Sequence, residues 1–122
     1  NETIPQLKCS IVAGAANNIL KDPKKHSEAL MKRGILYAPD YVINAGGLIN
    51  VYNELEGYNR DRAFSQAEAI YDILMDIFYK SEKENISTNL ASDQKAEERI
   101  HKISNLKSFY LPNRKNIILK GR

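Results

Sequence analysis

Cysteine and tryptophan are the scarcest residues of this chain: its 122 residues contain one cysteine, Cys9, and no tryptophan. A single cysteine cannot form a disulfide within the chain, which excludes a disulfide-stabilised scaffold and predicts a reducing, cytoplasmic location. Cys9 stands in an apolar segment, which predicts a buried and unreactive thiol. No apolar run approaches the ~20 residues that cross a bilayer, so no membrane partner is predicted.

Several signatures of catalytic and metal sites are also missing. Both histidines, His26 and His101, fall in charged helical patterns without a second histidine or cysteine at metal-ligand spacing, which predicts two solvated side chains and no metal site. The Gly-x-Ser-x-Gly turn of serine hydrolases and the Gly-x-Gly-x-x-Gly phosphate loop are absent. The first residue is Asn1, and no basic region precedes an apolar core. We therefore expect a piece of a longer protein without a secretory signal.

Acidic residues are absent after Glu98, although the net charge of the whole chain is only +3 and its pI is about 9.0. The cations of this last part are scattered, and only Phe109 and Tyr110 could stack on bases. This pattern is typical of a solvated or subunit-facing tail and predicts no nucleic-acid partner.

The composition, 43% hydrophobic and 27% charged, is typical of one folded unit. The pattern of the first third of the chain predicts an α/β structure. The apolar segment Leu7–Ala13 predicts a buried strand. Asp22 and Pro23 predict the start of a helix that ends at Gly34. Residues Ile35–Ala38 predict a second strand. A strand, a helix and a strand with short connections predict a parallel sheet with a right-handed crossover.

The rest of the chain reads as helical. One helix is predicted over Gly46–Leu55, and Asn59 can cap a long helix that ends at about Lys83. Thr88 can cap a further helix that ends at about Ile103. The long helix carries an apolar stripe with 4-3-4-3 spacing, formed by Ala63, Ala67, Ile70, Leu74 and Ile77.

Two short loops follow the predicted strands: Gly14-Ala15-Ala16-Asn17 and Asn44-Ala45-Gly46-Gly47. Ligands of open α/β sheets bind at the carboxyl ends of strands, and small residues let the backbone approach a ligand closely. An asparagine amide both donates and accepts hydrogen bonds, and a following helix offers free N–H groups. These loops therefore predict a ligand site. The alternative, that Asn17 and Asn44 only satisfy turn backbone, stays open at this point.

Four segments resemble, in the same order, the leucine dehydrogenase branch of the glutamate/leucine/phenylalanine/valine dehydrogenase family: IVAGAANN (11–18), YAPDYVINAGGLINV (37–51), EGYNRDRA (56–63) and AEERI (96–100). The resemblance covers about Ile4 to Arg99, with a weaker match toward the C-terminus. It implies an α/β fold, a partial Rossmann-like, dinucleotide-binding domain with C-terminal helices. Residues 1–58 would form the second half of the dinucleotide-binding domain, and residues 59–122 the helices that close the cleft.

The resemblance also implies an activity, which is the reversible oxidative deamination of an L-amino acid to its 2-oxo acid and ammonia with NAD as cofactor. The family's catalytic lysine and aspartate lie on a separate N-terminal domain, so this chain would contain no catalytic residue and would be inactive alone. Members are commonly homo-oligomers. In the isolated chain, some apolar faces would lack the segments that cover them in the whole protein, which predicts self-association. Residues that choose between NAD and NADP would precede Asn1.

By the same resemblance, Gly14, Ala15, Ala16 and Asn17 contact the cofactor, and Asn44 contacts both cofactor and substrate. Leu74 and Ile77 would line the pocket for the substrate side chain. Such a wall offers a γ-carboxylate no hydrogen-bond partner, which favours leucine, valine or isoleucine over glutamate. Phenylalanine or valine dehydrogenase activity is the alternative, followed by a non-catalytic binding module.

Overall fold

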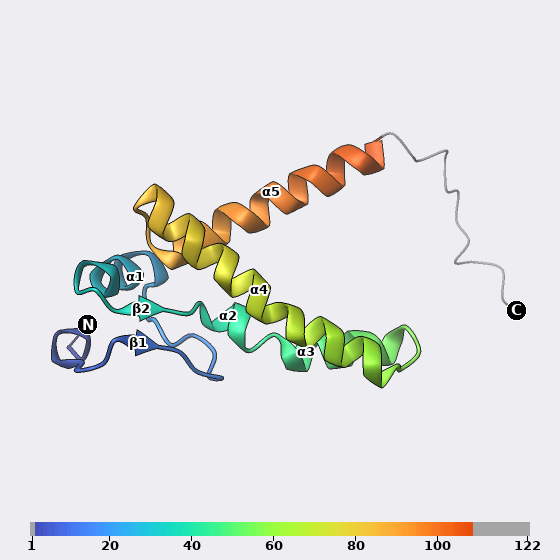
Figure 1. The fold of residues 1–122 in the computed structure, drawn as a ribbon, viewed down its shortest axis with the longest axis horizontal. Helices are drawn as coiled ribbons and strands as arrows, with labels where there is room; N and C mark the ends of the chain where they lie inside the picture. Colours follow the sequence, from blue (N-terminus) through green and yellow to red (C-terminus); the bar gives the residue numbers. More distant parts are fainter. Residues whose placement is uncertain (1, 109–122) are drawn as a thin grey trace, which may run out of the picture.

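The structure, a computed structural model, describes residues 2–108. Figure 1 shows a small sheet and its crossover helix at one end, from which the chain continues as helices only. In chain order the elements are a 3-10 helix η1 (Ile4–Gln6), β1 (Ile11–Val12), α1 (Pro23–Lys32), β2 (Leu36–Tyr37), α2 (Asp40–Ile43), α3 (Gly46–Leu55), α4 (Arg60–Glu84) and α5 (Thr88–Ser108). None of the helices in this range is long and apolar enough to span a membrane.

The two strands are parallel, as predicted, with Ile11 opposite Leu36 and Val12 opposite Tyr37. The predicted buried strand over Leu7–Ala13 is wrong in both length and burial. Only Ile11 and Val12 are in strand conformation, and Ile11 is 60% exposed. Within residues 2–108, β1 pairs with β2 alone, so no further strand extends its ladder.

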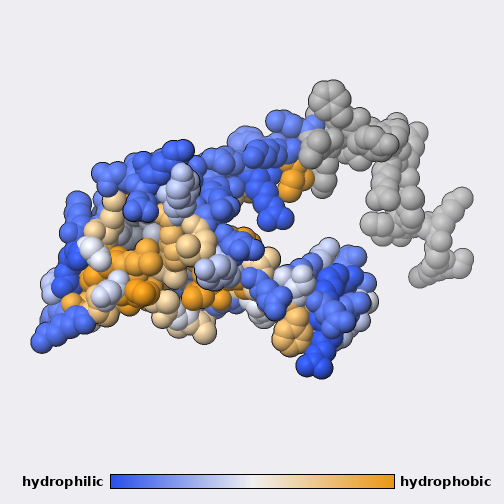
Figure 2. All heavy atoms as spheres, in the orientation of Figure 1, coloured by the Kyte–Doolittle hydropathy of each residue, from blue (hydrophilic) through white to orange (hydrophobic). Residues whose placement is uncertain are grey.

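Cys9 lies in the part of the predicted strand that the structure does not show as a strand. The structure places the thiol at the surface, so the predicted buried cysteine is wrong. Because the chain enters the short strand only at Ile11, Cys9 lies in an irregular segment before it. Figure 2 shows hydrophobic residues gathered on one face over the part of the molecule that holds β1, β2 and α2. Ile11, Leu36 and Tyr41 are the larger exposed apolar side chains of these elements.

The core of the α/β part lies between α1 and the sheet. It is formed by the buried residues Leu20, Leu30, Ile35 and Tyr37, with Ile4, Leu7 and Val12 packed around them. Helix α1 begins as predicted, since Asp22 Oδ1 accepts a hydrogen bond from the Lys25 N–H at 3.1 Å and Pro23 is its first residue. It ends before Gly34, which takes the left-handed φ of 68° that favours glycine.

The two histidines differ, and the prediction of two solvated side chains is wrong for His26. Its ring is buried against the first turn of α1, where Nδ1 accepts a hydrogen bond from the Asp22 N–H at 3.1 Å. A helix cap thus holds this histidine. His101 is exposed on α5, as predicted.

Helix α2 was not predicted from the sequence. After Pro39 ends the second strand, the chain makes a single helical turn, and the Asn44 N–H donates to the Asp40 carbonyl oxygen at 3.0 Å. Proline fixes φ near the helical value, which suits the residue just before such a turn. This turn carries the chain from β2 into the glycine-containing turn at 44–47.

The helical part follows the predicted boundaries closely. Helix α3 covers the predicted residues, and Asn59 caps α4 by accepting a hydrogen bond from the Arg62 N–H at 2.9 Å. Helix α4 ends at Asn85, which is left-handed at φ 52°. Thr88 is the first residue of α5 but not its cap. Ser87 caps the helix through its hydroxyl, which accepts from the Leu90 N–H at 3.4 Å.

The apolar stripe of α4 packs as predicted only in part, with Ala63 and Ile77 buried and the other members half-buried. At the α3–α4 junction the packing is polar. Asn53, fully buried, donates to the Ile49 carbonyl at 2.9 Å and to Gln66 Oε1 at 2.6 Å. The amide oxygen of Asn53 accepts a hydrogen bond from Arg62 Nε. This network fixes α3 against the start of α4.

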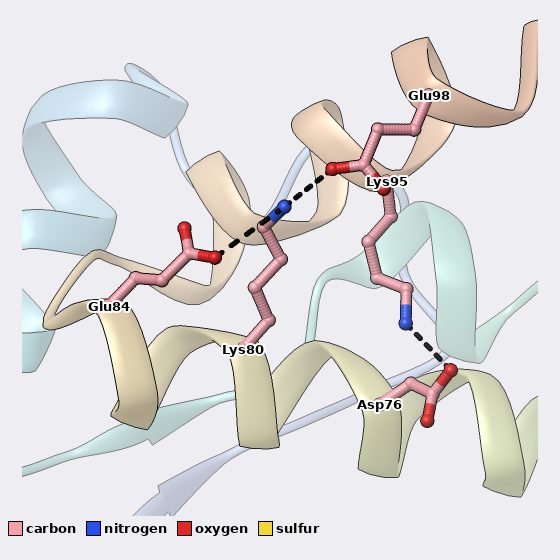
Figure 3. Close-up of polar contacts among 5 residues, drawn as sticks. All are labelled: Asp76, Lys80, Glu84, Lys95 and Glu98. Atoms are coloured by element: carbon pink, nitrogen blue, oxygen red, sulfur yellow. Dashed lines mark hydrogen bonds and ion pairs between the residues drawn. The ribbon is translucent and has the colours of Figure 1, made fainter.

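Helices α4 and α5 are joined by two ion pairs near the surface (Figure 3). Lys80 Nζ lies 2.7 Å from Glu98 Oε1, and Lys95 Nζ lies 2.6 Å from Asp76 Oδ2. Lys80 also lies 3.8 Å from Glu84 on its own helix. The hydrogen bond from Lys80 lowers the pKa of Glu98. Beyond this junction α5 diverges from α4, as Figure 1 shows.

Candidate functional site

The two predicted ligand loops meet in the structure. Asn17 lies in the loop that follows β1, and Asn44 ends α2, the single turn that follows β2. The side chains touch: Asn44 Nδ2 donates a hydrogen bond to Asn17 Oδ1. Because β1 and β2 are parallel, their carboxyl ends lie at the same edge of the sheet, where ligands of such sheets bind.

The small residues of the first loop leave its surface open. Ala15 and Ala16 are exposed, and Gly14 is half-buried. A Cβ added at Gly14 would lie 3.6 Å from Ile19 Cδ1, which is ordinary contact, so packing does not explain the glycine. Asn18 is left-handed at φ 56°, which turns the chain back toward the core after Asn17.

The glycine pair of the second loop also faces open space. No heavy atom of the described residues lies within 4 Å of a Cβ built at Gly46 or Gly47, apart from the immediate backbone. Neither residue has a φ that only glycine adopts readily. Their small size therefore serves neither internal packing nor turn geometry, and it leaves room beside Asn44 at the start of α3.

One buried carboxylate fixes this arrangement, and the sequence analysis missed it. Asp40 is 6% exposed, and its oxygens accept hydrogen bonds from the Ile19 N–H at 2.8 Å and the Tyr41 N–H at 2.7 Å. The Asp40 N–H itself donates to the Tyr37 hydroxyl at 3.2 Å. An acidic residue directly after a proline is typical of the first turn of a helix, and this signal could have pointed to it.

The two predicted residues of the substrate pocket, Leu74 and Ile77, lie on α4 and not in the two loops. Leu74 is half-buried. Ile77 is only 1% exposed and borders a cavity of about 630 Å³ together with Tyr41 and Val42 of α2. The cavity lies between α2, α4 and α5. The structure thus brings Asn17 and Asn44 into contact. Ile77 does not join them, and it borders a cavity that α2 also lines.

Two exposed apolar residues next to the glycine pair were not singled out from the sequence. Leu48 is 75% exposed and Val51 is 53% exposed, although both belong to α3. They are three residues apart, so they share one face of the helix. Their apolar type and helical spacing, directly after the glycine turn, were the signal available in the sequence.

The phenol next to the buried carboxylate of Asp40, Tyr41, carries no charge. Burial raises the pKa of Tyr41 to about 12, and its hydroxyl donates to Asp93 Oδ1 at 3.1 Å. Tyr41 is therefore neutral at physiological pH. No group of three or more histidine, cysteine, aspartate or glutamate side chains within residues 2–108 is arranged to hold a metal ion. What the site offers is two amides and open space, which can bind and orient a ligand.

Comparison with known proteins gives the family. Residues 1–110 match the model of the Glutamate/Leucine/Phenylalanine/Valine dehydrogenase family. The leucine dehydrogenase of Bacillus cereus is 51% identical over 118 residues, which is 97% of this chain and 32% of that protein. The L-tryptophan dehydrogenase of Nostoc punctiforme is 53% identical over 108 residues, 88% of this chain and 31% of that protein.

A solved structure agrees with these matches. The crystal structure of L-tryptophan dehydrogenase from Nostoc punctiforme superposes with a TM-score of 0.80 at 54% identity, covering 83% of this chain and 31% of that one. The chain therefore spans about a third of the length of the relatives it matches. On the family match and these identities, the chain belongs to the glutamate/leucine/phenylalanine/valine dehydrogenase family.

Proposed function

We propose that this chain is the part of an NAD-dependent amino-acid dehydrogenase that forms one side of its cofactor and substrate site. The reaction is the reversible oxidative deamination of a branched-chain L-amino acid, with leucine as first choice, to its 2-oxo acid and ammonia. The observation that carries the proposal is the hydrogen-bonded pair of Asn17 and Asn44 at the carboxyl end of a parallel sheet. The family match and the names of the relatives support the type of reaction.

The residues present fit a nicotinamide cofactor. The bond between the amides uses one donor of Asn44 and one acceptor of Asn17, and each amide has further donor and acceptor capacity for a ribose hydroxyl or a carboxamide. Gly14, Ala15 and Ala16 leave a flat approach beside Asn17. The chemistry that a bound nicotinamide would supply is that of an acceptor for the hydride of the substrate α-carbon. The residues of this chain orient the two reactants for that transfer.

The parallel β1-α1-β2 unit supports a partial Rossmann-like fold for residues 1–58. Helices α4 and α5 support the closing helices proposed over residues 59–122, of which residues 109–122 lie outside the described part of the chain. The remaining two thirds of the protein would supply the catalytic lysine and aspartate, so this chain alone would be inactive. The exposed Ile11 and Leu36 support further subunit or domain contacts in a homo-oligomer. A cytoplasmic location is proposed from the single cysteine.

For the substrate side chain, two apolar surfaces are available in this chain. Leu74 and Ile77 form the one that the family resemblance implies. Leu48 and Val51 form the other, and both of these are exposed on α3, which begins two residues after Asn44. Leu48 and Val51 are aliphatic and give a buried γ-carboxylate no partner, which favours leucine, isoleucine or valine over glutamate. The cavity that Ile77 borders is also lined by Lys95, Arg99 and Lys102, so that surface disfavours a γ-carboxylate less strongly.

An aromatic L-amino acid is the second candidate substrate. The L-tryptophan dehydrogenase of Nostoc punctiforme is as similar to this chain as the leucine dehydrogenase of Bacillus cereus, at 53% and 51% identity. Similarity over this third of the protein therefore does not separate the two substrate classes, because part of the pocket lies outside it.

The test is the formation of reduced nicotinamide by the intact polypeptide, with leucine, isoleucine, valine, phenylalanine, tryptophan and glutamate offered one at a time. We expect the highest kcat/KM with the branched aliphatic substrates. A preference for tryptophan or phenylalanine would instead support the second candidate. No turnover of any of them by a folded protein would contradict the proposed function.

Matched leucine variants would locate the pocket. Leu48→Ala and Leu74→Ala remove the same atoms from the two apolar surfaces. The variant that lines the pocket is expected to raise KM for leucine about tenfold, since a few buried methylene groups contribute that much binding. Gln94→Ala on α5 serves as the control. If Leu48→Ala and Leu74→Ala both had the same KM for leucine as Gln94→Ala, neither surface would be part of the substrate pocket.

A further inference from the structure

Asp40 has an unusual place in the structure, because it is a buried carboxylate held by backbone N–H groups. Its two oxygens accept from the Ile19 N–H and from the Tyr41 N–H, at 2.8 and 2.7 Å. No ion pair within the described residues includes Asp40. A buried carboxylate is stable only when such donors replace its hydration. The buried carboxylate of Asp40 is therefore stable only while Ile19 and the first turn of α2 keep these positions.

The bond to Ile19 is the long-range one, and it acts on the cofactor loop. Ile19 comes two residues after Asn17, and between them Asn18 is left-handed at φ 56°. The carboxylate thus anchors the chain immediately after the reversal that presents Asn17. Without that anchor, the exposed loop of small residues would have fewer restraints on the position of the Asn17 amide.

The backbone of Asp40 acts on the other half of the amide pair. Its carbonyl oxygen accepts a hydrogen bond from the Asn44 N–H at 3.0 Å, which closes the single turn of α2. Its N–H donates to the Tyr37 hydroxyl and thereby fixes the turn to the end of β2. One residue therefore contacts both of the segments whose side chains meet as Asn17 and Asn44.

The chemistry of the side chain explains why a carboxylate serves here. Two N–H donors from different segments approach its two oxygens, and both carboxylate oxygens are acceptors. An asparagine has one acceptor oxygen, and its NH₂ group would face the second N–H. Asp40→Asn therefore keeps the size and shape of the side chain while one of the two bonds becomes impossible.

We propose that Asp40 is a positioning residue of the cofactor site, which fixes the Asn17–Asn44 amide pair by binding the cofactor loop to α2. The inference rests on the proposed function, in which this pair contacts the cofactor. Asp40 itself is buried and is not a catalytic residue. Its effect should therefore appear in cofactor binding more than in the chemical step.

The experiment compares Asp40→Asn with Asp22→Asn in the intact enzyme. Asp22 is a matched control, because it is also a carboxylate that accepts a backbone N–H, and asparagine is an equally good helix cap. We expect Asp40→Asn to raise KM for NAD about tenfold with kcat changed much less, and Asp22→Asn to change neither. Hydrogen exchange should show faster exchange at Ile19 in Asp40→Asn only.

The outcomes separate the inference from the proposed function. A wild-type enzyme that turns over no amino acid contradicts the function. An active wild type with an unchanged KM for NAD in Asp40→Asn overturns the inference alone. Equal losses in kcat and cofactor affinity together with a lower melting temperature also overturn it, since those indicate a merely structural role. Asp40→Ala, which removes both acceptors, should exceed Asp40→Asn in its effect on KM for NAD.

Discussion

The sheet region and the helical region of this molecule differ in how far along the chain their stabilising partners lie. In the sheet region, strands of two residues each are held by a neighbour 25 positions away, as the pairing of Ile11 with Leu36 shows. In the helical region, α3, α4 and α5 form most of their backbone hydrogen bonds internally, and side chains next to the first residues of α4 and α5 cap their starts. Helices can thus form completely within this chain, whereas β1 has one partner strand in the described part.

The candidate site combines the two regions. Its first loop depends on the sheet and on the distant carboxylate of Asp40, whereas the glycine turn leads directly into α3. The position of Asn17 therefore relies on tertiary contacts, and the position of Asn44 relies on one local helical turn. A change that weakens the sheet region should disturb Asn17 first.

The largest expected effect is the loss of a core side chain from the sheet region. Leu30 is fully buried between α1 and the strands, so Leu30→Ala should lower the free energy of unfolding by about 3 kcal/mol. Chemical denaturation followed by circular dichroism measures this change. Leu55→Ala is the control, because Leu55 is 81% exposed on α3 and should change stability by less than about 0.5 kcal/mol. Equal effects of the two variants would contradict the packing of this core.

A smaller effect is expected from a local end signal of the helical region. Asn59→Ala removes the side-chain oxygen that accepts the Arg62 N–H at the start of α4, which should lower the free energy of unfolding by about 1 kcal/mol. Asn59→Asp keeps an acceptor and should be close to neutral. Thermal unfolding by circular dichroism compares the two. A destabilisation by Asn59→Asp as large as that by Asn59→Ala would show that the cap is not the cause.

Residues that act locally were the ones that sequence reasoning placed correctly. The starts at Asp22 and Asn59, the end at Gly34 and the bounds of α3 are confirmed, because each depends on side chains within a few residues. The strand over Leu7–Ala13 and the burial of Cys9 were wrong, because they depend on neighbouring strands and cover. Helix α2 was missed because one turn is too short to show a period.

The candidate site follows the same division. The two loops and their asparagines could be predicted, since small residues and an amide after a strand are visible locally. Their direct hydrogen bond could not be predicted, because it depends on the way β1 and β2 pair. Asp40 was missed for the same reason, since its partner Ile19 lies 21 residues away. Leu74 and Ile77 as pocket residues stay a prediction.

The smallest expected effect concerns the ion pairs between α4 and α5. The Lys80 hydrogen bond lowers the pKa of Glu98 below its ordinary value of 4.5, so the ionised carboxylate stabilises the fold above that pH and this contribution is lost as pH falls. Glu98→Gln should therefore make the free energy of unfolding fall less steeply as the pH is lowered. The change in this free energy should be smaller than that caused by Asn59→Ala, because the pair lies near the surface and is screened. Urea denaturation at a series of acidic pH values measures this slope. Glu97→Gln is the matched control, and the same slope in both variants would show that Lys80 does not hold Glu98. Such a result would leave Lys95–Asp76 as the ion pair between α4 and α5 that contributes to the fold.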